Sequence, residues 1–257
     1  MTSPASRLEH DLLGARHLPE QAYYGIHTLR ALENFPISGA PISVYPELIR
    51  ALACVKQAAA EANAELGLLA EAKRRAIVAA CAEIRTGALH EQFVVDVIQG
   101  GAGTSTNMNA NEVIANRALE LMGHQRGEYQ YCSPNDHVNR SQSTNDAYPT
   151  AIHIGMYYTH LKLVKHFKEV IDAFRRKGEE FAHVIKMGRT QLQDAVPMSL
   201  GQEFTGFATN ILEEVRRLEI NGELLLEINL GATAIGTGLN SPPEYSALAV
   251  RRLAEIT

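Results

Sequence analysis

The sequence predicts a mainly α-helical protein built around an elongated helical bundle, preceded by a smaller and mostly helical domain. Two observations carry this prediction. Apolar residues recur every seven positions between residues 156 and 181, and in alternating steps of four and three between residues 204 and 225. Both spacings are typical of packed, nearly parallel helices.

The shorter helices come first along the chain. Residues 1–45 show little periodicity and contain several prolines, as loops do. From Pro46 a helix is predicted that ends near Gly67. Its apolar stripe consists of Leu48, Leu52, Val55, Ala59, Ala62 and Leu66. A second helix is predicted over 70–86 and a third over 111–122.

Two much longer helices follow, one over about 149–185 and one over about 204–225. At 1.5 Å per residue the first would be roughly 55 Å long. Helices of that length are rare in compact domains. We therefore expect their apolar stripes to be covered by partner subunits.

The last residues predict the start of one more helix. Ser241, Pro242 and Glu244 form the pattern of an N-cap, a proline in the first turn and a reciprocal glutamate. The apolar pattern then runs to Ile256 without a C-cap signal. Two long helices and a short one do not close a bundle. We expect an N-terminal domain over residues 1–142 and, over 143–257, the first part of a truncated central bundle.

Composition narrows the class of function. The chain has 257 residues and a net charge of −5, which argues against a general nucleic-acid binder. Its three cysteines, Cys54, Cys81 and Cys132, form neither a disulfide pattern nor a zinc motif and are typical of a reducing compartment. No signal peptide or membrane-spanning stretch is visible. These features predict a cytoplasmic enzyme or binding protein.

Three polar segments lie between the predicted helices: Gly100–Asn109, Ser141–Asp146 and Gly188–Asp194. Short hydroxyl and amide side chains are good helix caps, and a helix start with extra donors suits an anion such as a carboxylate. Taken singly, each segment is most simply a turn, a cap or a helix connection. Together they indicate one site assembled from several parts of the fold.

Other site chemistries find less support. Gly101 and Gly103 are not preceded by a strand, and no Gly-Lys-Ser/Thr follows them, so neither a dinucleotide loop nor a P-loop is indicated. His153 and His160 are seven residues apart, not the four of a helical metal pair. No serine stands in a Gly-x-Ser-x-Gly turn. We expect neither a metal nor another cofactor.

Four ordered segments resemble the fumarase/aspartase superfamily, and the resemblance covers nearly the whole chain. They are Tyr24–Ala31, the run from Gly101–Ser105 to Asn107–Glu112, the run from Pro134–Asn139 to Ser143–Asp146, and Gly188–Pro197. The resemblance implies the family's elongated helical-bundle fold, of which this chain is similar to the N-terminal part only.

Within the superfamily the chain is most similar to the aspartase branch, the aspartate ammonia-lyases. Gln191 follows Thr190 where fumarases usually carry histidine, and the run from Leu121 to Tyr129 resembles aspartases as well. The implied reaction is elimination of ammonia from L-aspartate to give fumarate, through an aci-carboxylate dianion. Two alternatives stay open: a class II fumarate hydratase, and a truncated, non-catalytic subunit or assembly module.

The resemblance also implies which residues bind the small dicarboxylate. By position, Thr104, Ser143 and Thr144 would hold its carboxylates. Neutral hydroxyls suit a dianion because they donate hydrogen bonds without titrating.

Three further positions would serve the amino end of the substrate. Asn145 and Thr190 would address the amino group or its neighbouring carboxylate, and Gln191 could accept a hydrogen bond from the ammonium. The family's catalytic base is a serine on a Gly-Ser-Ser loop, and no such segment occurs in these 257 residues. The resemblance further implies a homotetramer, with each site built from three subunits.

Overall fold

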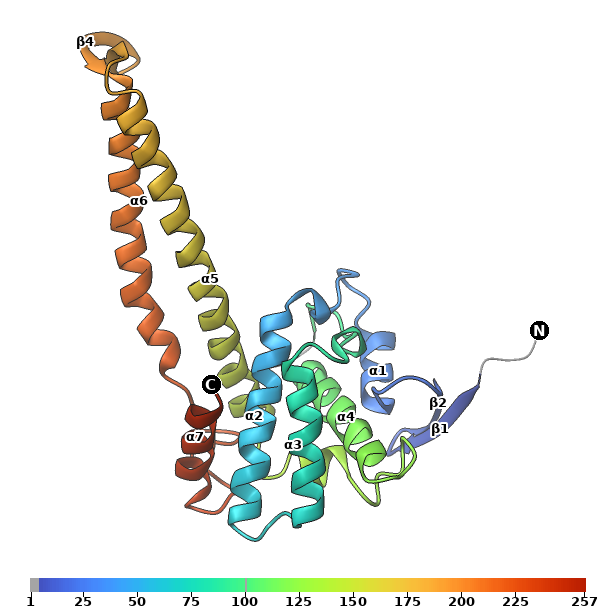
Figure 1. Cartoon of the computed structure of the whole chain (residues 1–257). Coiled ribbons are helices and arrows are strands. Elements are labelled where there is room, and N and C mark those ends of the chain that lie inside the picture. The colour runs from blue at the N-terminus through green and yellow to red at the C-terminus, as the bar shows by residue number, and fades with distance from the viewer. Residues whose placement is uncertain (1–4, 100) are drawn as a thin grey trace. The chain divides into compact units, whose positions relative to one another are not determined.

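The computed structural model describes residues 5–99 and 101–257, so Gly100, which opens the first polar segment, and residues 1–4 lie outside the described residues. The chain is mainly α-helical, as predicted (Figure 1). Its contacts define two compact units. One comprises the described residues up to Gly155 together with Ile228–Thr257, and the other comprises Met156–Glu227. The expected domain boundary between residues 142 and 143 stays a prediction.

The first unit begins with a β-hairpin and a short helix, in a region where the sequence shows little periodicity. Strands β1 (Ser6–Asp11) and β2 (Gly14–Pro19) are antiparallel, and α1 spans Ile26–Asn34. The first turn of α1 has no local cap. Instead, the buried Glu112 carboxylate accepts hydrogen bonds from the N–H groups of Gly25, His27 and Thr28. This cap comes from a distant helix, so the local sequence does not reveal it.

Helix α2 (Pro46–Glu65) is the centre of the first unit. It packs against α3 (Glu71–Arg85) and α7 (Tyr245–Ile256), as Figure 1 shows. Residues on every side of α2 are buried, and alanine is the commonest residue among them. Small side chains allow close helix contacts, and a helix that is apolar all round belongs in a core. The predicted helices over 46–66 and 70–86 are thereby confirmed. Short 3₁₀ turns lie at Ile42–Val44 and His90–Gln92.

Helix α4 (Thr104–Leu121) starts seven residues before the predicted start at Asn111. The polar run was expected to be a loop because asparagine is a poor helix former. In the fold these side chains have partners outside the helix. For example, Asn109 accepts from Val94 N–H and donates to the Gln92 carbonyl. Tertiary hydrogen bonds thus outweigh local helix propensity here.

The second unit is an antiparallel helix pair joined by a hairpin. Helix α5 (Thr144–Glu180) enters it from the first unit, and α6 (Leu200–Gly222) returns, followed by a 3₁₀ turn at Glu223–Leu226. The two long helices are confirmed, each starting four or five residues earlier than predicted. Between them, β3 (Ile185–Thr190) and β4 (Gln193–Ser199) pair antiparallel. Residues 188–191, for which a plain helix connection was the simplest alternative, belong to this hairpin.

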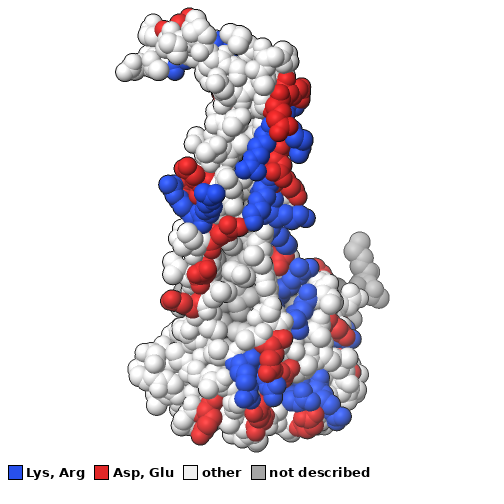
Figure 2. Space-filling model, turned by 60° about the vertical axis from the view of Figure 1, so that its left-hand side comes forward, with Lys and Arg blue, Asp and Glu red and all other residues white. Residues whose placement is uncertain are grey.

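Helix α7 lacks its predicted cap. The Ser241 hydroxyl, which was expected to cap the helix, donates to the Gly238 carbonyl and closes a turn instead. Helix α7 begins at Tyr245 and has no side-chain cap. Figure 2 shows acidic and basic side chains close together on the face that it draws. The second unit contains the ion pairs Lys168–Glu219 and Lys177–Glu180. Among the described residues, no helix is long and apolar enough to cross a membrane.

Candidate active site

The candidate site is centred on the first turn of α5, where the side chains of Ser143 and Asp146 each accept a hydrogen bond from a backbone N–H. Ser143 Oγ accepts from Asn145 N–H at 3.2 Å, and Asp146 Oδ1 accepts from Ser143 N–H at 2.9 Å. These two bonds satisfy donors that a helix start leaves open. The cap expected from the Ser141–Asp146 composition is therefore present. Since Ser143 Oγ accepts here, its own O–H remains a donor for a ligand.

Asp146 also fixes a second loop against this turn. It is fully buried, and its Oδ2 accepts from Gly231 N–H and Thr233 N–H, both at 3.0 Å. Asn145 Nδ2 donates to the Ala234 carbonyl at 2.9 Å. A buried carboxylate is stable when several N–H groups surround it. The loop Asn229–Ser241, rich in glycine and threonine, is thereby held beside the N-terminus of α5.

Pro149 contributes to the same junction. It lies inside α5 and has no N–H, so it cannot donate to the carbonyl of Asn145 one turn earlier. Asn229 Nδ2 takes that place and donates to the Asn145 carbonyl at 3.0 Å. A proline that weakens the helix locally thus creates an attachment point for the Asn229–Ser241 loop.

Beneath the turn lies a buried lysine. Lys56, on α2, has 0% exposure, and its Nζ donates to Asn107 Oδ1, Asn139 Oδ1 and Gln142 Oε1 at 2.7–2.9 Å. Burial lowers the pKa of Lys56 to about 7, and the negative charge of Asp146 opposes the fall. An ammonium group has three N–H bonds, which match these three carbonyl oxygens. Lys56 therefore ties α2, α4 and the loop before α5 together.

The N-terminus of α4 meets the N-terminus of α5. Gly103, the N-cap of α4, has φ +96°, and a Cβ there would overlap the Tyr148 ring of α5. One turn on, Asn107 Nδ2 donates to Thr144 Oγ1 at 3.2 Å. Since Thr144 Oγ1 accepts this bond, its O–H remains a donor. Thr104 is the exposed first residue of α4 and directly follows Gly103.

Two helix starts and their hydroxyls are thus brought into one region. The predicted residues Thr104, Ser143, Thr144 and Asn145 all belong to it. Aligned N–H groups give each helix start a partial positive charge. The region can therefore bind a carboxylate by neutral donors, in a protein whose net charge is −5.

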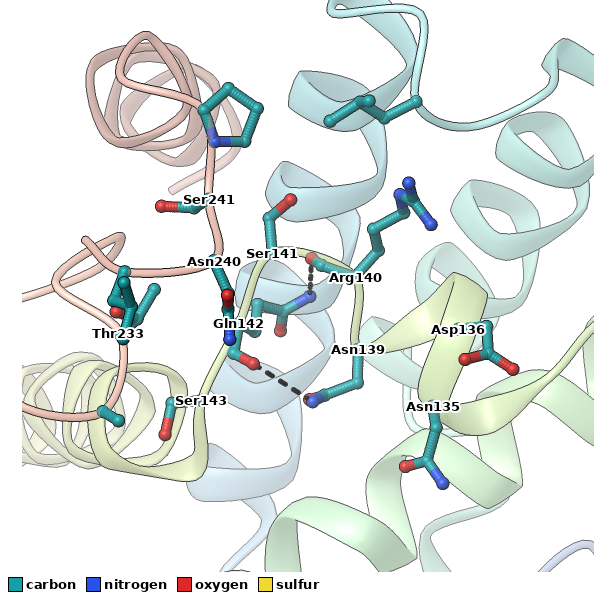
Figure 3. Close-up of a pocket in the computed structure, with 14 residues that line it drawn as sticks. Asn135, Asp136, Asn139, Arg140, Ser141, Gln142, Ser143, Thr233, Asn240 and Ser241 are labelled. Carbon is teal, nitrogen blue, oxygen red and sulfur yellow. Dashed lines mark hydrogen bonds between the residues drawn. The ribbon is translucent and has the colours of Figure 1, made fainter.

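A cavity of about 760 Å³ opens beside Ser143 (Figure 3). It lies between the loop 139–143, which follows a π-helical turn at Pro134–Val138, and the loop 233–242. Three residues lining it have left-handed backbone: Ser141 at φ +59°, Thr233 at +58° and Asn240 at +66°. For a β-branched residue such as Thr233 this conformation is unusual. Strain of this kind costs about 1–3 kcal/mol and gathers at functional sites.

Thr190 and Gln191 belong to the second unit. They lie at the turn of the β3–β4 hairpin, where Thr190 pairs with Gln193. Gln191 at φ +50° and Leu192 at +63° form a two-residue turn with left-handed backbone and no glycine or asparagine, the residues that such a turn favours. Their role in substrate binding stays a prediction.

The prediction from sequence missed Lys56 and the Asn229–Ser241 loop. A signal existed for each. Lys56 stands four residues after Leu52 on the apolar side of a predicted helix, where a charge is unexpected. The run Gly231–Gly238 has the same small and polar composition as the three segments that were selected.

Comparisons with known proteins show strong similarity to lyases. A family model described as "Lyase" matches residues 14–257. The chain is 64% identical to an aspartate ammonia-lyase of Pseudomonas canavaninivorans, over 100% of this chain and 55% of that protein. It is 60% identical to the aspartate ammonia-lyase of Escherichia coli K12, over 98% of this chain and 53% of that protein.

Comparison with solved structures shows the same similarity to lyases. A fumarate lyase:delta crystallin of Brucella melitensis matches with a TM-score of 0.93 at 56% identity, over 98% of this chain and 55% of that one. A class II fumarase of Schistosoma mansoni matches with a TM-score of 0.90 at 36% identity, over 98% and 53%. The chain spans about half the length of these relatives. The family model and the identities together show that this chain belongs to the fumarase/aspartase family of lyases.

Proposed function

We propose that this chain is part of an aspartate ammonia-lyase, which eliminates ammonia from L-aspartate to give fumarate. The observation that carries the proposal is the pair of hydroxyls at the start of α5. Ser143 and Thr144 each accept a bond from the protein and keep an O–H for a ligand. The identity of 64% to an aspartate ammonia-lyase, against 36% to a fumarase, favours aspartate over malate.

The reaction requires stabilisation of a developing dianion. When a base removes the proton beside the β-carboxylate, that carboxylate takes up a second negative charge. Preorganised donors lower the barrier if they are aimed at this charge. We assign Thr104, Ser143 and Thr144 to the substrate carboxylates, on the two helix starts.

The amino end of the substrate needs acceptors. Asn145 Nδ2 is bound to Ala234, which fixes its amide, so we assign Asn145 Oδ1 to the amino group. Thr190 would address the amino group or its neighbouring carboxylate, and Gln191 would accept from the ammonium. We propose that the complete protein is a cytoplasmic homotetramer. Exposed apolar residues on α5 and α6, such as Leu163, Val170 and Phe207, support subunit contacts there.

The test is to incubate the complete subunit with L-aspartate and, separately, with L-malate, while fumarate is followed by its ultraviolet absorbance. We expect fumarate from aspartate, with an equal amount of ammonia. Fumarate from malate alone would instead identify a fumarase. Fumarate from neither substrate would favour the assembly role.

Thr144→Ala in the complete subunit is expected to lower kcat/KM for L-aspartate on the order of 10²-fold, the scale of losing one transition-state donor. Asn145→Ala is expected to act similarly. Thr144→Ser keeps the hydroxyl and serves as the matched control. Near-normal rates in both alanine variants would remove these residues from the site.

The 257 residues alone are expected to show no measurable lyase activity, because they contain no Gly-Ser-Ser segment to supply the base. The measurement is fumarate release by the purified fragment, compared with the complete subunit at equal concentration. Clear turnover by contaminant-free fragment would contradict this expectation.

A further inference from the structure

The Thr233 hydroxyl is buried without a hydrogen-bond partner. Its side chain belongs to a residue only 6% exposed, and Oγ1 has no partner in the described structure. A buried, unpaired hydroxyl destabilises a protein, so its presence needs a reason. Of the six buried side-chain polar atoms without a partner among the described residues, Thr233 Oγ1 alone belongs to a residue lining the cavity beside Ser143.

Thr233 is held rigidly next to the substrate-binding turn. Its N–H donates to Asp146 Oδ2, and the following residue, Ala234, accepts from Asn145 Nδ2. These two bonds attach both sides of Thr233 to the first turn of α5. Figure 3 shows Thr233 and Ser143 in the same pocket, on neighbouring segments. Thr233 is therefore part of the cavity wall at a fixed position relative to Ser143, and its hydroxyl oxygen is covered from solvent in the ligand-free protein.

We propose that Thr233 is a further substrate-binding residue, whose hydroxyl donates a hydrogen bond to a carboxylate of the dicarboxylate held at the N-terminus of α5. This inference rests on the proposed function and adds the Asn229–Ser241 loop to its site. A neutral donor suits a substrate with two negative charges, as at Ser143 and Thr144. The bound carboxylate supplies the partner that Oγ1 lacks. The left-handed backbone of Thr233, at φ +58°, sets the direction of the side chain.

Two variants of the complete subunit test the inference. Thr233→Val keeps the β-branched shape and the backbone preference and removes only the hydroxyl, whereas Thr233→Ser keeps the hydroxyl. We expect Thr233→Val to lower kcat/KM for L-aspartate about 10²-fold, the scale of losing one donor to the transition state. Thr233→Ser is expected to stay within about threefold of wild type, since the donor remains.

Stability separates this role from a structural one. Because Oγ1 is unpaired without ligand, its replacement by a methyl group is expected to leave the thermal unfolding temperature of the ligand-free protein unchanged or raised. Activity and stability would thus move in opposite directions. Wild-type kcat and KM in Thr233→Val would overturn the inference. A fall of the ligand-free unfolding temperature in Thr233→Val would overturn it as well.

Succinate, an unreactive dicarboxylate, makes the test independent of turnover. It is expected to raise the unfolding temperature of the wild-type subunit and of Thr233→Ser, and to raise that of Thr233→Val much less. If the wild type forms no fumarate from aspartate but shows this succinate pattern, the proposed function fails and Thr233 remains a dicarboxylate ligand. Equal shifts in wild type and Thr233→Val, or no shift in the wild type, would overturn the inference.

Discussion

Replacing Asp146 with alanine is expected to lower the free energy of unfolding of the complete subunit by about 3–5 kcal/mol. The buried carboxylate accepts from three N–H groups, those of Ser143, Gly231 and Thr233. Each buried donor left unpaired costs about 1–3 kcal/mol. Because the same bonds place Ser143 and the Asn229–Ser241 loop, kcat/KM is expected to fall about 10³-fold or more.

Asp146→Asn is the matched control. Its amide oxygen can take the place of Oδ2 and accept from Gly231 and Thr233, while its NH₂ group then faces Ser143 N–H, a donor against a donor. We expect an intermediate loss of both stability and activity. Thermal unfolding and fumarate release measure the two effects. An Asp146→Ala subunit that unfolds at the wild-type temperature would show that these bonds do not hold the junction.

The helices of this fold follow from local patterns in the sequence. The stripes starting at Pro46 and near Ala70 predict α2 and α3 because apolar residues of each helix pack on neighbouring helices. The seven-residue spacing in α5 predicts the long antiparallel pair for the same reason. Helix starts were harder to predict. Thr104–Asn109 is helical because distant groups such as Lys56 bond its asparagines.

The sequence predicts the short-range interactions of the candidate site but not its long-range ones. The Ser143 cap follows from short-range chemistry between residues three apart. The second bond of Asp146 reaches Gly231, 85 residues away, and no local pattern encodes that distance. The capping of α1 by Glu112 is likewise a contact between residues far apart in the sequence. Sequence spacing therefore identifies the donors at a helix start, and the tertiary fold identifies what holds them.

Replacing Lys56 with methionine is expected to lower kcat/KM about 10³-fold at neutral pH, because several site groups are displaced together. The variant removes the donor to Asn107, Asn139 and Gln142. Three carbonyl oxygens would then face one another without a proton between them. Asn107 in turn donates to Thr144 Oγ1, so the loss extends to the hydroxyl that we propose binds the substrate carboxylate. Lys165→Met, at an exposed position on α5, is the control.

The effect of pH on stability gives a sharper test of Lys56. In the folded protein its pKa is about 7, against an ordinary value of 10.5, because burial disfavours the ammonium. Between pH 7 and pH 10.5 the unfolded chain therefore binds more protons than the folded protein. The contribution of Lys56 to the free energy of unfolding therefore rises with pH in this window, by about 1.4 kcal/mol per pH unit. Below about pH 6 both the folded and the unfolded state hold the proton, so the contribution of Lys56 no longer changes with pH.

The difference between wild type and Lys56→Met isolates this contribution. Cys81, whose pKa burial raises above its ordinary value of 9.0, destabilises the folded state at alkaline pH in both proteins and largely cancels. We expect the unfolding temperature of the wild type to rise relative to that of Lys56→Met as pH increases from 7 toward 10, and the gap to be constant below about pH 6. Parallel curves across the whole range would mean that Lys56 keeps an ordinary pKa. The three amide oxygens would then offset the full cost of burying its charge.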